Sequence, residues 1–293
     1  MHRETSPRSA DRSNLQVLSC PCRKPACSIL HKPDYKASEA SRRIRNTWND
    51  VAGVWDEFIE GGLDYSRLQV HGPALLRACG SVRGLRVLDL GCGQGFFSRR
   101  LARRGAKVTG VDIAEKMVDL AQAHEKKHAL GIQYRVMDAA TVNEAWPRGA
   151  FELAVACMSL HDMADPEAVL RASHRVLAKD GRMAFSIVHP TNSTAFREWE
   201  TNEKGEYLAL KIDHYFEKGE YAVPWTMQRL RHHWSTSSYR FTLADWSAMI
   251  EHAGFVIQRI YEPRPTRAQV AQHPENDVAF RLPFFLVFSL VKG

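Results

Sequence analysis

The fold of this chain is decided by one stretch, Arg86 to Ser98, which reads RVLDLGCGQGFFS. Its first half is a short apolar run of the kind that forms central strands of parallel sheets. Three glycines come next, Gly91, Gly93 and Gly95, which allow positive φ angles and let a ligand approach the backbone closely. Apolar residues then recur at helical spacing. We therefore predict a buried strand, a glycine turn and a helix whose first N–H groups face the turn.

The glycine pattern differs from the usual dinucleotide-binding turn. That fingerprint, G-x-G-x-x-G, needs a glycine at position 96, where this chain has Phe96. Here an acid, Asp89, precedes the glycines, and a second predicted strand over 107–111 ends in Asp112. An acid at the tip of the second strand is positioned to accept hydrogen bonds from the two hydroxyls of a ribose.

The motif, its spacing and the terminal acid resemble those of the class I S-adenosylmethionine (SAM) dependent methyltransferases. The resemblance covers about residues 45–190. Within this family, the chain resembles the small-molecule group, which is similar to the methyltransferases of ubiquinone and menaquinone biosynthesis (methyltransferase type 11). It implies an α/β, Rossmann-like fold with a seven-stranded, mostly parallel sheet and an antiparallel last strand. It also implies an enzyme whose cofactor is SAM and whose cofactor product is S-adenosylhomocysteine.

The order of the predicted elements gives the domain organisation. Strands and helices alternate from 86 to 188, which predicts a parallel sheet with right-handed crossovers. We expect a turn at Lys179–Gly181 before a fifth strand over 182–188. Five parts are predicted: a disordered basic leader (1–36), an N-terminal helical cap (37–84), the SAM-binding core (85–190), an insertion after strand five (191–240), and a C-terminal helix and β-hairpin that complete the sheet (241–293). The aromatic-rich insertion either forms a lid over the substrate pocket or is an ordinary packed subdomain.

The cap is predicted to begin with a helix at Ala37. Apolar residues recur there on one helical face: Ile44, Trp48, Val51 and Trp55. In the family that this chain resembles, the segment before the first strand often folds over the cofactor. Tyr65 and Arg67 would then touch the methionine end of SAM, or Tyr65 simply packs in a surface turn.

The resemblance assigns the cofactor contacts to the turn and the strand ends. The three glycines leave room for the methionine and ribose portions, Asp89 orients the turn, and Asp112 holds the ribose hydroxyls. Met158, after the fourth strand, lies under the sulfonium. Asp138, after the third strand, either accepts a bond from the adenine amino group or caps a helix. The predicted cofactor-binding residues are Asp89, Gly91, Cys92, Gly93, Gly95, Asp112, Ile113, Met117, Asp138, Ala139, Met158 and Tyr65.

The residues after the fourth strand indicate the class of acceptor. The chain lacks the Asn/Asp-Pro-Pro-Tyr/Phe sequence common in nucleic-acid and amide N-methyltransferases, which argues against methylation of a base amino group. His161 is there instead, and an imidazole can accept a proton near neutral pH, although it can equally pack locally. His189, after the fifth strand, is a second candidate base. The insertion supplies a further candidate group around the substrate pocket: His232, His233, Trp234 and Tyr239.

Charge and hydropathy restrict the partners. The net charge is +7, but residues 1–45 hold ten Lys/Arg and four Asp/Glu, so the remainder is close to neutral. The core therefore offers no electrostatic argument for nucleic-acid binding. The longest apolar run, Leu282–Val291, is too short to cross a bilayer, and the first thirty residues do not read as a signal peptide. We expect a cytoplasmic monomer or homodimer with a small-molecule acceptor.

Three of the six cysteines cluster in the leader, as Cys20-x-Cys22-x4-Cys27-x3-His31. Three thiols and an imidazole could hold zinc. The spacing is not that of a standard finger and its surroundings do not read as folded, so we expect an unstructured leader and no metal site.

These observations favour an enzyme that methylates a small hydrophobic or aromatic metabolite at O, C or N, in biosynthesis. An alternative is an RNA or protein methyltransferase that uses the basic N-terminal arm. A second alternative is a non-catalytic SAM-binding module, which the retained glycines and Asp112 argue against.

Overall fold

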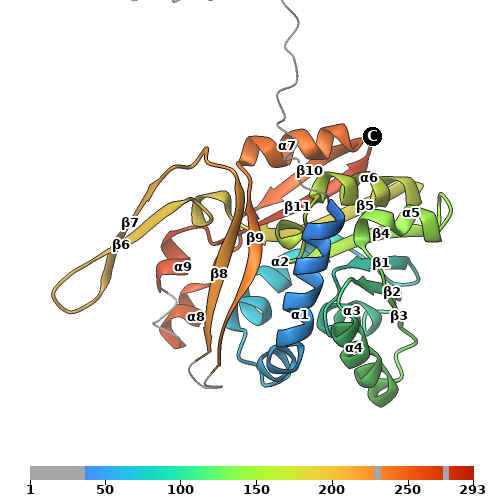
Figure 1. The fold of residues 1–293 in the computed structure, drawn as a ribbon, viewed down its shortest axis with the longest axis horizontal. Helices are drawn as coiled ribbons and strands as arrows, with labels where there is room; N and C mark the ends of the chain where they lie inside the picture. Colours follow the sequence, from blue (N-terminus) through green and yellow to red (C-terminus); the bar gives the residue numbers. More distant parts are fainter. Residues whose placement is uncertain (1–36, 228–231, 273–276) are drawn as a thin grey trace, which may run out of the picture. The chain divides into compact units, whose positions relative to one another are not determined.

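The computed structural model describes residues 37–227, 232–272 and 277–293. The predicted leader, with its cysteine cluster, lies outside these residues. Within them, the chain folds around a seven-stranded sheet of order β10-β11-β5-β4-β1-β2-β3 (Figure 1). The strands of this sheet are β1 Arg86–Leu90, β2 Lys107–Asp112, β3 Gln133–Val136, β4 Phe151–Cys157, β5 Leu177–Val188, β10 Phe255–Tyr261 and β11 Phe285–Lys292. β11 runs antiparallel to β5 and β10, and the other neighbours are parallel, which confirms the predicted fold class.

Helices cover both faces of the sheet. The α-helices are α1 Ala37–Glu60, α2 His71–Cys79, α3 Phe96–Ala102, α4 Glu115–His128, α5 Val142–Ala145, α6 Pro166–Val176, α7 Leu243–His252, α8 Arg267–Gln272 and α9 Asp277–Arg281. Short 3₁₀ turns are η2 Ala139–Thr141, η3 Leu160–Asp162 and η4 Pro190–Asn192, and η1 Ser66–Val70 is a π-helix. Local sequence explains several helix starts. Asp165 caps α6 ahead of Pro166, and Thr242 and Asp245 form the capping box that begins α7.

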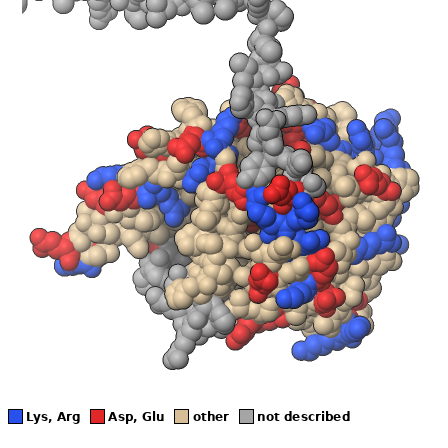
Figure 2. All heavy atoms as spheres, in the orientation of Figure 1, with Lys and Arg blue, Asp and Glu red and all other residues tan. Residues whose placement is uncertain are grey.

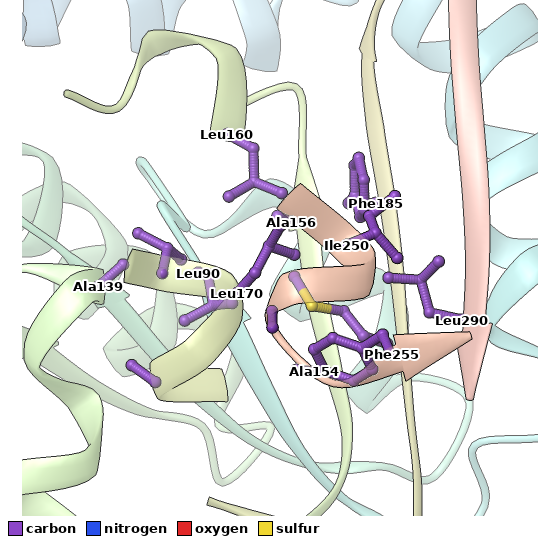
Figure 3. Packing of buried hydrophobic residues seen from close by; sticks show 14 of the residues in the cluster. Leu90, Ala139, Ala154, Ala156, Leu160, Leu170, Phe185, Ile250, Phe255 and Leu290 are labelled. Atoms are coloured by element: carbon purple, nitrogen blue, oxygen red, sulfur yellow. The ribbon is translucent and has the colours of Figure 1, made fainter. Parts of the chain in front are cut away.

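The central strands are buried on both faces because alternate side chains enter two different clusters. Leu88 and Leu90 of β1 belong to one cluster, with residues of α6 and α7, whereas Val87 belongs to the other, with residues of α2, α3 and α4. Figure 3 shows the first cluster, in which Phe185 of β5 and Ile250 of α7 lie between the layers. This packing holds the carboxyl ends of the parallel strands at one edge of a rigid sheet.

The fifth strand differs from the prediction. The sequence predicts a turn at Lys179–Gly181, but β5 begins at Leu177 and continues through this segment. Its register against β4 jumps from the pair Phe151 and Leu177 to the pair Leu153 and Arg182. The intervening residues therefore bulge out of the ladder instead of ending the strand, because the extra length is absorbed as a register shift.

The described residues of the predicted insertion form four strands in two separate hairpins. β6 Phe196–Thr201 pairs with β7 Tyr207–Asp213, and this hairpin extends away from the central sheet (Figure 1). β8 Gly219–Met227 pairs with β9 His232–Arg240. This second hairpin packs beside α1, where the ring centres of Trp55 and Trp225 lie 5.3 Å apart. In the described parts of the chain, we find no helix with the length and apolar character that a membrane span requires.

Candidate active site

Two adjoining cavities lie at the carboxyl ends of the parallel strands. The first has a volume of about 390 Å³ and is lined by the glycine turn and the ends of β2 and β4. The second, of about 730 Å³, lies between α1, η1, η3 and the β8–β9 hairpin. Trp48, Trp55, Arg67, Met158 and Asp162 line both, so the two cavities share a wall.

The first cavity brings together most of the residues predicted to bind the cofactor. Those that line it are Asp89, Gly91, Cys92, Gly93, Asp112, Ile113, Met117, Asp138, Ala139 and Met158. Gly95 is not among the described residues of its wall, and Tyr65 lines the second cavity instead. Tyr65 precedes the π-helix η1, which directs this segment toward the second cavity.

The three glycines of the turn meet different surroundings. All have positive φ, but a Cβ on Gly95 would lie 2.4 Å from the Tyr134 hydroxyl oxygen, and one on Gly91 would lie 2.6 Å from Ser159 Cβ. At Gly93, no atom of the described residues would lie within 4 Å of an added Cβ. Protein atoms therefore fill the space beside Gly91 and Gly95, and the space beside Gly93 is open.

Two acids of this cavity are held by backbone N–H groups. Asp112 accepts hydrogen bonds from Gly93 N at 2.8 Å and from Ala114 N at 2.9 Å, while burial raises the pKa of its carboxyl. Asp138 caps η2 by accepting from Ala140 N at 2.9 Å, and its other oxygen accepts from the Ser41 hydroxyl of α1 at 3.1 Å. Asp138 thus caps a short helix and lines the cavity at the same time.

Asp89 is fully buried at the end of β1. Its Oδ2 accepts a 2.5 Å hydrogen bond from the Ser98 hydroxyl, whereas its Oδ1 has no partner in the described part of the chain. Burial raises the pKa of this carboxyl to about 6, and the neighbouring Asp112 adds to the rise. An unpartnered, buried carboxylate oxygen beside a cavity suits a cationic group of a ligand.

Met158 occupies the wall between the cavities in an uncommon backbone conformation. Its φ is +55°, in the left-handed region that an unbranched side chain rarely adopts. Hydrogen bonds from Met158 N to Ser186 O and Ser186 Oγ, both 3.1 Å, hold it there. Such strain commonly marks functional positions, and here it lies between the two cavities.

Arg67 forms another part of the shared wall. Its Nε lies 2.9 Å from Asp64 Oδ2, and its backbone N–H donates to Asp64 Oδ1. Burial alone would lower the pKa of the guanidinium, but Cys157 and Asp64 outweigh it and raise the pKa. The guanidinium also lies 5.7 Å from the centre of the Trp55 ring. Arg67 is therefore a paired, charged residue beneath an aromatic ring.

The second cavity is walled by aromatic side chains and contains polar groups that have no hydrogen-bond partner among the residues described. Its aromatic residues are Trp48, Trp55, Phe58, Tyr65, Tyr221, Trp225, Phe284 and Phe285. His161 also lines it, with 8% of the residue exposed, and its Nε2 lies 3.7 Å from Asp162 Oδ1. Among the described residues, nothing is hydrogen bonded to His161 Nδ1. The cavity can therefore bind a flat apolar molecule next to an imidazole.

The other predicted acceptor-side residues lie elsewhere. His189 is bonded to the Thr191 hydroxyl at 2.8 Å and lies 3.2 Å from Glu262, and it is not among the described residues of either wall. His233 is exposed, and the side chain of His232 lies outside what the structure describes.

Strand phase accounts for Tyr239 but not for Trp234. From β9, Thr236 and Ser238 line the second cavity, and the intervening positions and Tyr239 do not. Trp234 shares the phase of Thr236 and Ser238 but is not among the described residues of the wall; it is half-buried, and its ring centre lies 6.3 Å from that of Trp225.

Sequence reasoning missed several residues that line the second cavity. His71, 2% exposed, and Trp225 are the largest omissions. Trp225 belongs to the aromatic-rich insertion, so composition gave a partial signal. His71 stands alone at the start of α2 with no motif around it, and only the three-dimensional structure brings it to the cavity.

A group of possible metal ligands lies outside both cavities. Asp56, Glu60 and His124 offer ligand atoms within 4.8 Å of one another. His124 Nε2 is already 2.8 Å from Asp56 Oδ1, and Glu60 is paired with Arg99. These contacts tie α1 to α3 and α4 as an ion-pair network, so the ligand atoms are occupied by protein partners.

A cavity over a glycine turn at the carboxyl ends of the parallel strands, on this sheet order, is the arrangement of a Rossmann-like ligand-binding fold. Comparisons with known proteins agree. The methyltransferase domain family matches residues 88–185. A SAM-dependent methyltransferase from Mesorhizobium loti, solved by crystallography, is 31% identical, with a TM-score of 0.64 over 75% of this chain and 96% of that one. The chain therefore belongs to the class I SAM-dependent methyltransferases, and SAM is its cofactor.

Curated relatives match over little more than a third of this chain. Ubiquinone biosynthesis O-methyltransferases of Pseudomonas entomophila and Pseudomonas aeruginosa are each 35% identical, over 109 and 106 residues respectively. These segments are 37% and 36% of this chain, and they span about half the length of the relatives, 47% and 45%.

Proposed function

We propose that this protein transfers a methyl group from SAM to a small hydrophobic or aromatic metabolite, at oxygen, carbon or nitrogen, in a biosynthetic pathway. One observation carries the proposal: a cavity with nucleoside-binding features adjoins a larger aromatic cavity, and Met158 and Arg67 line both. The name of the curated relatives, which methylate oxygen in ubiquinone biosynthesis, supports an acceptor of this class. We further propose that the enzyme works in the cytoplasm, as a monomer or homodimer.

The residues of the first cavity fit SAM. The unpartnered Asp89 Oδ1 suits the ammonium group, and the open space beside Gly93 admits a ligand to the turn. We assign Asp112 to the ribose hydroxyls, and Asp138 with Ala139 to the adenine. The acids are held by backbone N–H groups before any ligand arrives, so little reorganisation accompanies binding.

The methyl group that bound SAM supplies is carried on a positively charged sulfur. In the second cavity, the chain's own residues position the acceptor, exclude water and remove a proton where the acceptor must lose one. We assign His161 as the base, because its buried ring lines this cavity and carries an unpartnered nitrogen. Asp162, 3.7 Å from Nε2, would stabilise the protonated ring.

The alternative of an RNA or protein methyltransferase draws its support from charge alone. The excess of basic residues lies within residues 1–45. On the described surface in Figure 2, Lys and Arg are interspersed with Asp and Glu, so this face carries no single-signed patch for a polyanion.

Label transfer tests the proposal. The full-length protein is incubated with methyl-labelled SAM and a host extract divided into small-molecule, RNA and protein fractions. We expect label in the organic-soluble small molecules, and less of it with an Asp112→Ala variant, which lacks the carboxylate that we assign to the ribose of SAM. Label confined to RNA or protein would overturn the proposal. A calorimetric titration with SAM, run in parallel, separates absence of the right acceptor from failure to bind the cofactor.

A further inference from the structure

His71 is a buried histidine in the second cavity to which no step of the proposed reaction gives a role. It is the first residue of α2, 2% exposed, and its ring lines the cavity. The ring lies against Phe285, with centres 4.8 Å apart. Its Nδ1 has no hydrogen-bond partner within the described ranges of the chain. A histidine that served only packing would have its buried nitrogens paired, because an unpaired one is costly.

A π-turn brings His71 to this position. The backbone N–H of His71 donates to Ser66 O, which closes η1 with a five-residue spacing. A Cβ on the following residue, Gly72, would lie 2.1 Å from Arg67 O, so only glycine permits the turn to approach so closely. Both Arg67 and His71 line the second cavity as a result. Single π-turns of this kind recur at functional sites.

The charge of His71 is fixed by its surroundings. Burial lowers the pKa of the imidazole to about 3, and the cationic Arg67 lowers it further than the nearby Asp64 raises it. The ring is therefore neutral at physiological pH, with one donor nitrogen and one acceptor nitrogen. It cannot act as a cation toward an acidic acceptor, and it is too weak a base to take a proton.

The other charged residues that line the second cavity are paired or exposed. Asp64 and Arg67 neutralise each other, and Asp162 lies beside His161. Arg197 occupies an exposed position, where its Nη1 donates to Asn192 O at 2.9 Å. The surface around His71 is thus aromatic, with the Asp64–Arg67 ion pair, whose charges cancel, and the guanidinium of Arg100, which also lowers the pKa of His71.

We propose that His71 is a specificity-determining residue that hydrogen-bonds an uncharged polar group of the acceptor, at a position other than the methylated one. This inference rests on the proposed function, since it concerns the same cavity. The acceptor is then an aromatic compound with at least two polar groups. One lies next to His161 and Met158 and receives the methyl group, and the second, a hydroxyl or a comparable neutral group, pairs with His71.

Binding of matched probes tests this role without turnover. The full-length protein, saturated with S-adenosylhomocysteine, is titrated calorimetrically with 2-naphthol and with each dihydroxynaphthalene isomer. We expect at least one isomer to bind about tenfold more tightly than 2-naphthol, as one added hydrogen bond in a buried site allows. In His71→Phe that preference should fall to less than twofold, while 2-naphthol affinity stays within threefold. His189→Phe, outside the cavity walls, should keep the wild-type preference.

A second variant and the label experiment decide the cases that His71→Phe alone leaves open. His71→Gln retains hydrogen-bonding groups and should restore part of the preference, and it replaces His71→Phe if that variant no longer binds S-adenosylhomocysteine. The inference is overturned if no isomer binds the wild type better than 2-naphthol, or if the preference survives in both variants. Methyl transfer in the label experiment combined with such a result would refute the role of His71 and leave the proposed function standing.

Discussion

The two cavities of this protein are built in different ways. The first is built on the glycine turn and the ends of adjacent strands, with side chains of α1 along one wall, and its acids, Asp112 and Asp138, are already bonded to backbone N–H groups. The second is made by side chains from α1, η1, η3 and β8–β9, and Nδ1 of His71 and of His161 there has no hydrogen-bond partner in the part of the chain that the structure describes. A backbone-built site is preorganised for one ligand, whereas a side-chain-built site changes its preference with each substitution.

This difference predicts that a substitution in one cavity can impair its function and leave the other cavity unaffected. The largest effect is expected at His161, the proposed base. His161→Gln should lower kcat by roughly 10²–10⁴-fold, as expected for loss of a general base. SAM affinity should stay within about twofold, because His161 is not among the described residues of the first cavity. Turnover with a fixed acceptor and calorimetric titration with SAM measure the two quantities.

His189→Gln is the matched control for this substitution. His189 is equally buried, but it is bonded to Thr191 and Glu262 away from both cavities, so its turnover should equal that of the wild type. If the two variants lost turnover equally, the loss would reflect the fold, and His161 would not be the base.

The same contrast explains what could be predicted from sequence. The strand, turn and acid of the first cavity are adjacent along the chain, so Asp89, Gly93 and Asp112 carry a local signal. The second cavity depends on contacts between distant segments, and its composition depends on strand phase and packing. Nothing near His71 in the sequence signals that a π-turn brings it there, because Gly72 permits the close approach to Arg67 O but does not by itself indicate it.

Residues assigned to the acceptor by position alone illustrate the same limit. His233 and Tyr239 lie in the aromatic-rich insertion, but on β9 it is Thr236 and Ser238 that line the cavity. A one-residue change of phase reverses which side chains point inward, and sequence composition does not fix that phase. His189 comes after a parallel strand as predicted, yet its partners Thr191 and Glu262 hold it away from the cavities.

Two glycines of the turn test whether the first cavity is set by backbone. Gly95→Ala places a methyl group 2.4 Å from the buried Tyr134 hydroxyl at a φ of +84°. It should lower the free energy of unfolding by about 2–5 kcal/mol, from backbone strain and overpacking together. Gly93→Ala has a φ of +54° but open space, so it should cost only about 1–2 kcal/mol.

For SAM affinity, corrected for the folded fraction of each variant, the order of the two substitutions should reverse: Gly93→Ala should have the larger effect. The methyl group of Gly93→Ala enters the space that we assign to SAM, so this variant should bind SAM more weakly than its small loss of stability suggests. Urea denaturation and SAM titration of both variants provide the comparison. Equal loss of stability at the two positions would mean that the turn tolerates neither side chain, irrespective of its surroundings.

The buried acid of the first cavity and the buried imidazole of the second should titrate with opposite signs. Asp89 has its pKa raised to about 6, so protonation stabilises the folded state. That contribution is complete below the pKa of the unfolded chain, about 3.9, and is lost as the pH rises through 6. The stability of the wild type relative to Asp89→Asn should therefore increase by roughly 2–3 kcal/mol between pH 7 and pH 4.

His71 should show the reverse. Its pKa is lowered from 6.5 to about 3, so its neutral form contributes stability above pH 6.5 that is lost as the pH falls toward 3. The wild type should lose stability relative to His71→Phe over the same interval. Denaturation of the three proteins at a series of pH values checks both signs. If the free energies of unfolding of all three proteins changed equally with pH, neither Asp89 nor His71 would have the shifted pKa that its burial predicts.

Asp112→Asn should give the smallest effect on affinity. It is also the sharpest test of whether the two cavities bind their ligands independently. The amide keeps an oxygen for Gly93 N but removes the negative charge, so hydrogen bonds from a ribose diol become neutral pairs. SAM affinity should fall about tenfold, which corresponds to about 1.4 kcal/mol. Acceptor-probe affinity, measured with S-adenosylhomocysteine saturating, should not change, because Asp112 lines the first cavity and no part of the shared wall. A matching loss of probe affinity would mean that the two cavities bind their ligands as one unit, and that the backbone-built site also sets the preference of its neighbour.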